Sequence, residues 1–245
     1  MDFRIGDVVN RTFGAISRNF LVFFLLSAVL VGIPTVALGL IQYSVGVGGE
    51  SVFWLTFALA FFVNIAAAYV LQGALIHGAV VDFNGSRASF GNCLKTGVDH
   101  LFPLFVIAIL MTLGVSLGMM LLIVPGIILS IMWIVAVPAQ VVENKGITES
   151  FGRSRELTKG NRWKIFGLFI IYLILATVIS MLVMLPATVL TTSSGAETSL
   201  MLVFIQVVST VLTAVVSATG VSALYYELRK SKEGVGAEAL AKVFD

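Results

Sequence analysis

Charged residues are scarce in this chain. Only 11% of its 245 residues are Asp, Glu, Lys or Arg, whereas soluble domains carry about 25%. The mean hydropathy of +1.04 leaves too few polar side chains to cover a surface in contact with water. These values exclude the soluble secreted, disordered and nucleic-acid-binding classes, and they place most of the chain in a membrane.

Cysteine and the common cofactor motifs are also missing. Cys93 is the only thiol, so no intramolecular disulfide can form, which fits a membrane protein that faces the inside of the cell. Cys93, Asp99 and His100 lack the paired spacing of a metal site. No Gly-rich loop ends in Lys-Ser or Lys-Thr, as a phosphate-binding loop would. We therefore expect no metal, no cofactor and no intrinsic ATPase activity.

One motif resembles a catalytic one. Gly114-Val-Ser-Leu-Gly118 matches the nucleophile elbow of hydrolases, but that motif needs a strand-turn-helix setting, and here it lies inside an apolar run. Ser116 lies roughly 22 Å into its apolar run and His77 roughly 6 Å into its own, at about 1.5 Å per helical residue. The two side chains cannot form a catalytic dyad. We expect no enzymatic activity and interpret Gly114 and Gly118 as a notch for close helix packing.

What the sequence does contain is long apolar runs. Six of them can cross a hydrocarbon core of about 30 Å, which takes about 20 helical residues. The predicted fold class is therefore all-α, a polytopic integral membrane bundle of six transmembrane helices. The predicted spans cover residues 20–43, 53–81, 101–124, 126–142, 163–190 and 200–226. Pro125 and Gly126 predict a tight turn that makes a hairpin of the third and fourth spans.

The basic residues lie on one side of these spans. All 15 Lys and Arg residues precede the first span, follow the last, or lie between the second and third or the fourth and fifth. The opposite loops contain only Glu50 and Glu197 as charged residues. Because basic residues are retained on the cytoplasmic side, we expect a multi-pass protein of a prokaryotic cytoplasmic (inner) membrane with both termini cytoplasmic.

The sequence also repeats internally. Val80-Val81-Asp82 recurs as Val141-Val142-Glu143, and Ser89-Phe90-Gly91 recurs as Ser150-Phe151-Gly152, at a constant offset of 61 residues. Pro125 and Pro186 differ by the same offset. We expect one membrane domain over 1–245, built from parallel units of an interfacial amphipathic helix plus a hairpin. Its parts are a weak repeat at 1–82, repeats at 83–143 and 144–227, and a cytoplasmic tail at 228–245.

Neutral polar residues within the spans are candidates for a binding pocket. Asn64 and Gln72 lie on nearly one face of the second span near mid-membrane, and Gln206, Ser209 and Thr213 lie in the sixth. Hydrogen bonds between helices explain most such residues. A polar-lined pocket for a lipid headgroup or another amphiphile is the alternative.

Acidic residues end each even-numbered span on the basic side. Asp82, Glu143 and Glu227 occupy helix C-termini, where the helix dipole disfavours a negative charge. We expect ion pairs with the interfacial helices, for example Glu143 with Arg155 or Lys159 of the segment that also carries Arg153. A basic segment of this kind also favours contact with anionic lipid headgroups.

Two segments resemble a known family. They are Pro125 to Trp163, with Pro138 and Glu143 among its most specific positions, and the run Tyr225-Tyr226-Glu227-Leu228-Arg229. The chain resembles the membrane domain associated with glycerophosphodiester phosphodiesterases and the six-helix bacterial inner-membrane proteins of the YciC type. The resemblance implies a polytopic membrane domain that accompanies a phosphodiesterase in some relatives. No part of this chain is long enough to be that catalytic domain.

Two functions remain open from the sequence. The first is a non-enzymatic bundle that binds or transports a lipid or other amphiphile. The alternative is a structural or assembly partner of other membrane proteins.

The one-sided basic residues give a testable topology. We expect Cys93 to be cytoplasmic and therefore protected from a membrane-impermeant maleimide added to intact cells. Labelling of the native thiol from outside would overturn the orientation.

Overall fold

The computed structural model describes residues 3–37, 50–194 and 198–234, and the regular elements in these ranges are all helical. Six helical segments are long and apolar enough to cross a membrane. These segments are Phe20–Ala37, Trp54–Phe83, Leu101–Leu121, Ile123–Glu143, Arg162–Leu182 and Val207–Glu233. The all-helical class and the six predicted spans are confirmed. The end of the first predicted span, beyond residue 37, lies outside the described residues.

A short helix precedes each pair of spans along the chain. The elements are α1 (Ile5–Arg18), α2 (Phe20–Ser27), the π-helical turn η1 (Ala28–Gly32), α4 (Glu50–Phe83), α5 (Phe90–Asp99), α6 (Leu101–Leu121), α7 (Ile123–Trp133), α8 (Ala136–Glu143), α9 (Ile147–Thr158), α10 (Arg162–Ser194) and α11 (Thr198–Glu233). Residues 228–233, predicted as part of a tail, are instead the last turns of α11.

Prolines explain the irregularities of two spans. Pro34 has no N–H to donate to the carbonyl of Leu30, and the helix widens into η1 at Ala28–Gly32 just before it. Pro138 likewise leaves the carbonyl of Ile134 without its helical donor, and the fourth span breaks between α7 and α8 at Ile134 and Val135. A broken helix survives in lipid only where other groups satisfy its backbone.

The turn between α6 and α7 lies earlier than predicted. Leu122 makes it with an extended backbone (φ −160°, ψ 143°), and α7 begins at Ile123. Pro125 therefore lies in the first turn of α7, where a missing N–H costs nothing because those N–H groups have no helical partner. The fourth span is correspondingly longer than the 17 residues expected, running over Ile123–Glu143.

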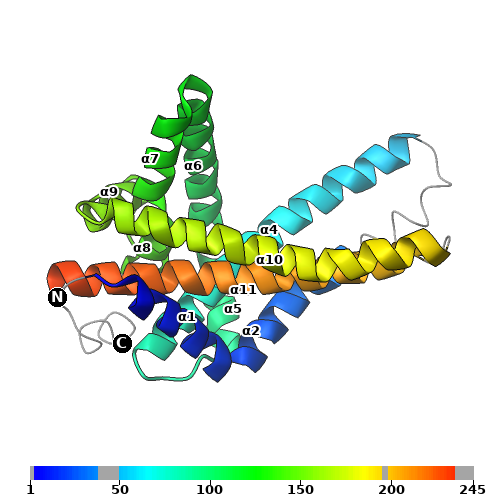
Figure 1. Ribbon diagram of the computed structural model, residues 1–245, viewed down its shortest axis with the longest axis horizontal. Helices are drawn as coiled ribbons and strands as arrows, with labels where there is room; N and C mark the ends of the chain where they lie inside the picture. Colours follow the sequence, from blue (N-terminus) through cyan, green and yellow to red (C-terminus); the bar gives the residue numbers. More distant parts are fainter. Residues whose placement is uncertain (1–2, 38–49, 195–197, 235–245) are drawn as a thin grey trace.

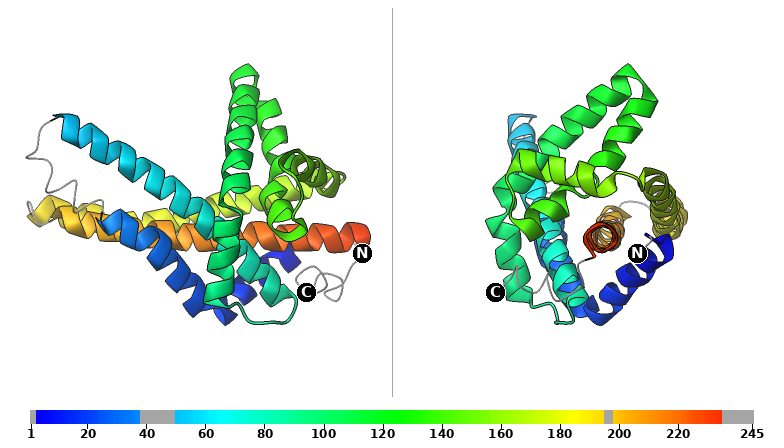
Figure 2. Two further views of the ribbon diagram at one scale, coloured as in Figure 1. Left: turned by 180° about the vertical axis from the view of Figure 1, so that it is seen from behind. Right: turned by 90° about the vertical axis from the view of Figure 1, so that its left-hand side faces the viewer.

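The outer halves of the spans diverge, so the six helices do not pack along their whole length as a compact bundle would. In Figure 1 the α6–α7 hairpin stands away from the long α10–α11 pair, while α4 leaves in a third direction, and both views of Figure 2 show the same separation. The far end of the hairpin, residues 120–124, is 65–86% exposed. Large apolar side chains gain little by contacting another helix rather than lipid tails, so these outer halves have no strong reason to associate.

The short helices pack on the protein at the opposite end from those tips. The apolar face of α1, predicted to lie on the membrane, instead buries Val8, Thr12 and Ala15 against neighbouring helices, chiefly α11. Helix α5 lies along α4 through small residues, because a Cβ on Gly97 would collide with the carbonyl oxygen of Val70.

Cys93 is buried in this α4–α5 interface, within 3.1 Å of where a Cβ on Gly78 would lie. Burial raises the pKa of its thiol to about 11, so very little reactive thiolate forms at neutral pH. Cys93 is therefore a poor topology probe, since it would resist labelling from either side. The topology test needs an introduced thiol at an exposed position of the same loop, such as Ser86→Cys.

The tight α4–α5 contact gives a prediction with a matched control. Gly97→Ala should lower the melting temperature in detergent and make Cys93 reactive toward maleimide, because the new methyl group meets rigid backbone of α4. Gly91→Ala in the same helix has nothing within 4 Å of its Cβ. It should leave stability unchanged or raised by up to about 1 kcal/mol through helix propensity. Equal behaviour of the two variants would contradict the packing.

Candidate functional site

Three carboxylates tie the short helices to the ends of the spans. We call Asp82, Glu143 and Glu227, together with the basic residues that pair with them, the charged base. Asp82 and Glu227 are buried and Glu143 is nearly so, its side chain being 9% exposed. Each therefore needs a counter-charge, since an unpaired buried charge costs several kcal/mol.

Asp82, near the end of α4, is bound by the end of α1. Nε of Arg18 donates to its Oδ1 at 3.0 Å, and a second guanidinium nitrogen donates to Oδ2. Nδ2 of Asn19 donates to Oδ1 at 2.7 Å, while its Oδ1 accepts the N–H of Ala88 at 3.1 Å. Asn19 thus links α1, the end of α4 and the loop before α5.

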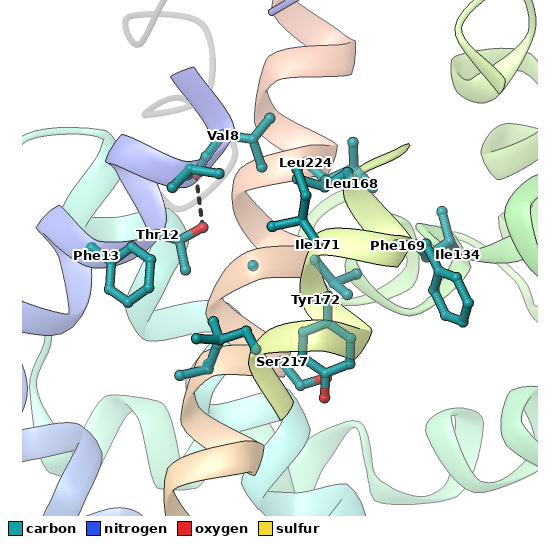
Figure 3. Close-up of a pocket in the computed structure, with 15 residues that line it drawn as sticks. Val8, Thr12, Phe13, Ile134, Leu168, Phe169, Ile171, Tyr172, Ser217 and Leu224 are labelled. Carbon is teal, nitrogen blue, oxygen red and sulfur yellow. Dashed lines mark hydrogen bonds between the residues drawn. The ribbon is translucent and has the colours of Figure 1, made fainter. Parts of the chain in front are cut away.

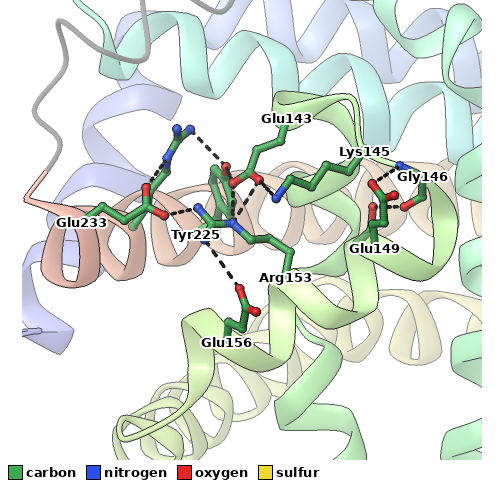
Figure 4. A network of polar contacts seen from close by, with 10 residues as sticks. Glu143, Lys145, Gly146, Glu149, Arg153, Glu156, Tyr225 and Glu233 are labelled. Atoms are coloured by element: carbon green, nitrogen blue, oxygen red, sulfur yellow. Dashed lines mark hydrogen bonds and ion pairs between the residues drawn. The ribbon is translucent and has the colours of Figure 1, made fainter.

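Glu143, the last residue of α8, lies at the centre of the largest network (Figure 4). Nε of Arg153 from α9 is 2.8 Å from its Oε1, Nζ of Lys145 is 3.0 Å from its Oε2, and the hydroxyl of Tyr225 from α11 donates to it at 2.7 Å. Arg153 also pairs with Glu233, which accepts from Arg229 at 2.9 Å. The network joins α8, α9 and the end of α11.

Glu227 is paired with Arg11 of α1. The Arg11 guanidinium carbon also lies 4.5 Å from the ring centroid of Tyr226, a cation–π geometry. The ring of Tyr226 in turn contacts Phe83 at the end of α4, with centroids 5.4 Å apart. Helix α1 therefore holds two span ends, through Arg11 and Arg18.

Glu143 forms the expected ion pair, but the predicted partner was wrong. Arg155 and Lys159 are exposed and form no ion pair among the described residues. Arg153 holds this role because it shares a side of α9 with the buried Ser150, Ser154 and Leu157.

Ser154, which sequence reasoning did not single out as a site residue, repairs the break in the fourth span. Its hydroxyl donates to the carbonyl of Met132 at 2.8 Å and accepts the N–H of Val135 at 3.3 Å. Thr158 follows one turn later and is also buried. The available signal was this pair of hydroxyl residues four apart, downstream of a proline within a span.

A cavity between α4 and α11 contains two residues of the predicted pocket, Asn64 and Gln72. We call it the amide cavity; its volume is about 370 Å³. It is lined by Val31, Asn64, Ala68, Leu71, Gln72, Leu75, Thr210, Ala214, Ser217 and Ala218. Asn64 uses its amide locally, donating to the carbonyl of Ala60 at 2.9 Å and accepting from Thr35 at 3.2 Å. The amide of Gln72 has no hydrogen-bond partner among the described residues.

Only part of the predicted pocket set lines this cavity. Asn64 and Gln72 do, but Ser209 and Thr213 do not, because each helical residue turns the side chain by about 100° and Thr210 and Ala214 hold the cavity face instead. Ser209 is buried elsewhere. The side chain of Gln206 lies outside the described residues.

The residues predicted to shape helix packing lie mostly in the α6–α7 hairpin. A Cβ on Gly114 would strike the Trp133 ring, and one on Gly118 would lie 3.1 Å from Cα of Gly126. Gly126 in turn faces the backbone of Met119. Pro186 lies within α10, where its side chain is outside the described residues.

The described residues offer few other groups for metal binding or catalysis. Within the described residues no group of three or more His, Cys, Asp or Glu side chains could hold a metal ion. Nδ1 of His100, the residue between α5 and α6, lies 2.9 Å from the carbonyl of Thr96 in α5. The candidate site therefore consists of a mainly apolar cavity within the spans, with a few neutral polar groups in its wall, and the charged base.

Comparison with known proteins identifies a family. The model of the membrane domain of glycerophosphoryl diester phosphodiesterase matches residues 100–238, more than half of the chain. Neither a curated protein nor a solved structure was found to match.

The Glu143 network gives a prediction. Glu143→Gln should remove about 2 kcal/mol of stability, because Lys145 loses its counter-charge and Arg153 retains only the more exposed pair with Glu233. It should also speed amide hydrogen exchange in residues 147–158. Glu156→Gln is the control, since Glu156 approaches the same Arg153 at 3.9 Å but its side chain is 75% exposed. Similar small effects from both substitutions would mean that Glu143 does not anchor α9.

Proposed function

Because the chain belongs to the family of the membrane domain of glycerophosphoryl diester phosphodiesterase, we propose that it works inside the bilayer as a non-enzymatic protein that binds or transports an amphiphile. The family match concerns the membrane part of that enzyme, not its catalytic part. Phosphodiesterase activity is accordingly no part of the proposal.

The amide cavity carries this proposal. Its volume of about 370 Å³ falls in the range of small-molecule sites, about 300–1,000 Å³. Gln72 places an amide against the cavity in a span where water is scarce, and an unsatisfied amide in hydrocarbon costs several kcal/mol. A ligand that hydrogen-bonds to Gln72 would recover this energy.

The lining also defines the chemical class of the ligand. None of its ten residues is charged, so an anionic or cationic headgroup would enter without a counter-charge. An amide both donates and accepts, and it therefore suits an uncharged hydroxyl or ester group. We propose a neutral acylated amphiphile that enters from the lipid side.

The orientation of the protein is a further part of the proposal. We place the charged base on the cytoplasmic side of a prokaryotic inner membrane, with both termini there, since the predicted spans leave all Lys and Arg of the chain on one side and basic residues are retained on the cytoplasmic side. Exposed basic residues near the charged base, such as Lys159 at the end of α9, would attract anionic headgroups on that side of the membrane.

The order of elements supports the proposed repeats. α1, α5 and α9 are short helices that each precede a pair of spans, and Asp82 and Glu143 occupy matching positions ahead of α5 and α9. The pairing of these acids differs, because Asp82 binds Arg18 of the preceding short helix and Glu143 binds Arg153 of the following one. Repeats of this kind have diverged in their contacts.

Native mass spectrometry of the gently purified protein tests the function. We expect it to retain a neutral acylated lipid and to take up 1,2-dioleoylglycerol when this is added. Gln72→Leu should raise the dissociation constant for this lipid about fivefold, the factor that corresponds to one lost hydrogen bond of about 1 kcal/mol, and occupancy at a limiting lipid concentration should fall accordingly.

Two threonines provide the matched control. Thr210→Val alters the cavity wall, whereas Thr213→Val removes the same hydroxyl from another face of α11, so only the first should change lipid occupancy. A protein partner that co-purifies in stoichiometric amount, with lipid occupancy unchanged in Gln72→Leu, would favour a structural or assembly role and overturn lipid binding.

A further inference from the structure

A second cavity lies on another side of α11, beneath α1 (Figure 3). We call it the apolar cavity; its volume is about 250 Å³. Val8, Thr12 and Phe13 of α1 form one wall, Leu168 and Tyr172 of α10 another, and residues 216–224 of α11 the third. Only Ser217 borders both this cavity and the amide cavity.

Gly220 leaves part of this space open, because it carries no side chain toward α1. A Cβ on Gly220 would lie 3.9 Å from both Cγ2 and Oγ1 of Thr12, an ordinary van der Waals distance, so α1 and α11 leave room for a methyl group between them at this level. The hydroxyl of Thr12 is turned back to the carbonyl of Val8 at 2.7 Å. It offers little to a polar ligand, and the other lining groups are almost entirely hydrocarbon.

Basic side chains lie at one end of this cavity. Lys164 is four residues before Leu168 on α10, hence on the same face of the helix, and its Nζ lies 3.1 Å from the carbonyl of Phe3. Arg4, the residue after Phe3, lies directly before α1 and is exposed. The Cβ position of Gly167 lies 3.7 Å from Ile5, which fixes the start of α1 against the start of α10.

The acidic groups nearby do not cancel this charge. Glu227, one turn beyond Leu224, is already paired with Arg11. Asp7 of α1 is exposed on the turn after Arg4. Neither Arg4 nor Lys164 forms an ion pair among the described residues.

We propose that the apolar cavity holds one acyl chain of an anionic phospholipid whose phosphate lies between Arg4 and Lys164. Hydrocarbon walls and a basic rim match the two ends of such a lipid. A helix of a partner protein, about 10 Å across with its side chains, is too wide for a space of about 250 Å³, whereas a segment of one acyl chain is narrow enough to enter it.

Photo-crosslinking in nanodiscs tests the site. The probe is a phosphatidylglycerol with a diazirine on one acyl chain, and its crosslinks should map to α1, α10 and residues 216–224 of α11. Excess unlabelled phosphatidylglycerol should compete. Phosphatidylcholine should compete several-fold less well, and inorganic phosphate should not compete, which separates a lipid from a free anion. Crosslinks confined to the outer faces of α6 and α7 would overturn the proposal.

Charge variants test the basic rim. Arg4→Gln with Lys164→Gln should weaken phosphatidylglycerol binding about 25-fold, or about fivefold for each base, the factor for about 1 kcal/mol. Arg87→Gln with Lys95→Gln removes the same charge from exposed positions in the loop before α5 and in α5 and should change binding less than twofold. Equal losses in both double variants would mean that the lipid responds only to net charge.

Cavity variants test the hydrocarbon part. Gly220→Leu should abolish crosslinking to Tyr172 and Val221, while Gly220→Ala, whose methyl group fits, should retain the fold and most of the crosslinking. If Gly220→Leu does not fold, the charge variants and the crosslink map still decide. Gln72→Leu should leave these crosslinks unchanged, so failure at this site is distinguishable from failure of the amide cavity.

Discussion

The structure depends on neutralising carboxylates at the ends of its spans. Asp82, Glu143 and Glu227 lie at or near helix C-termini, where both the helix dipole and the scarcity of water oppose a negative charge. Each is satisfied by a guanidinium from α1 or α9. Because these contacts connect elements far apart in sequence, they fix the short helices on the spans, and the diverging outer halves need no further contact with one another. The charged base, together with the buried apolar core that connects the same helices, therefore holds the hairpins together.

A second constraint acts on the backbone within the spans. Pro34 and Pro138 each remove a helical hydrogen bond, and lipid offers nothing to replace it. The first span responds by widening into η1. The fourth breaks, and Ser154 reaches it from α9 to bind the carbonyl of Met132 and the N–H of Val135. Since Arg153 of the same helix binds Glu143, α9 repairs the break and neutralises the acid at the end of the same span.

These features differ in how far the sequence could predict them. The spans follow from apolar length alone, and the need for counter-charges follows from acids at span ends. The identity of the partners does not follow, because Arg153 and Arg155 are two residues apart and only the burial of Ser150, Ser154 and Leu157 decides which side of α9 faces the protein. The same holds for Thr210 and Ser209, where one residue turns the side chain by about 100°. The position of the α6–α7 turn depends on Leu122, whose sequence gives no turn signal.

The small residues of α11 connect the packing to the proposed functions. Ala214, Ser217, Ala218 and Gly220 occupy faces that a leucine-rich span would fill, and the two cavities border those faces. Elsewhere in the protein a small residue lets two helices approach closely, as Gly97 of α5 does against Val70 of α4. On α11 they leave one open, because α1 is held at its distance by the Arg11–Glu227 pair and α4 by its own contacts near the base. The ion pairs that neutralise the span ends therefore also set the positions of the helices around these spaces, so the room available to the proposed ligands depends on charged residues that do not line the cavities.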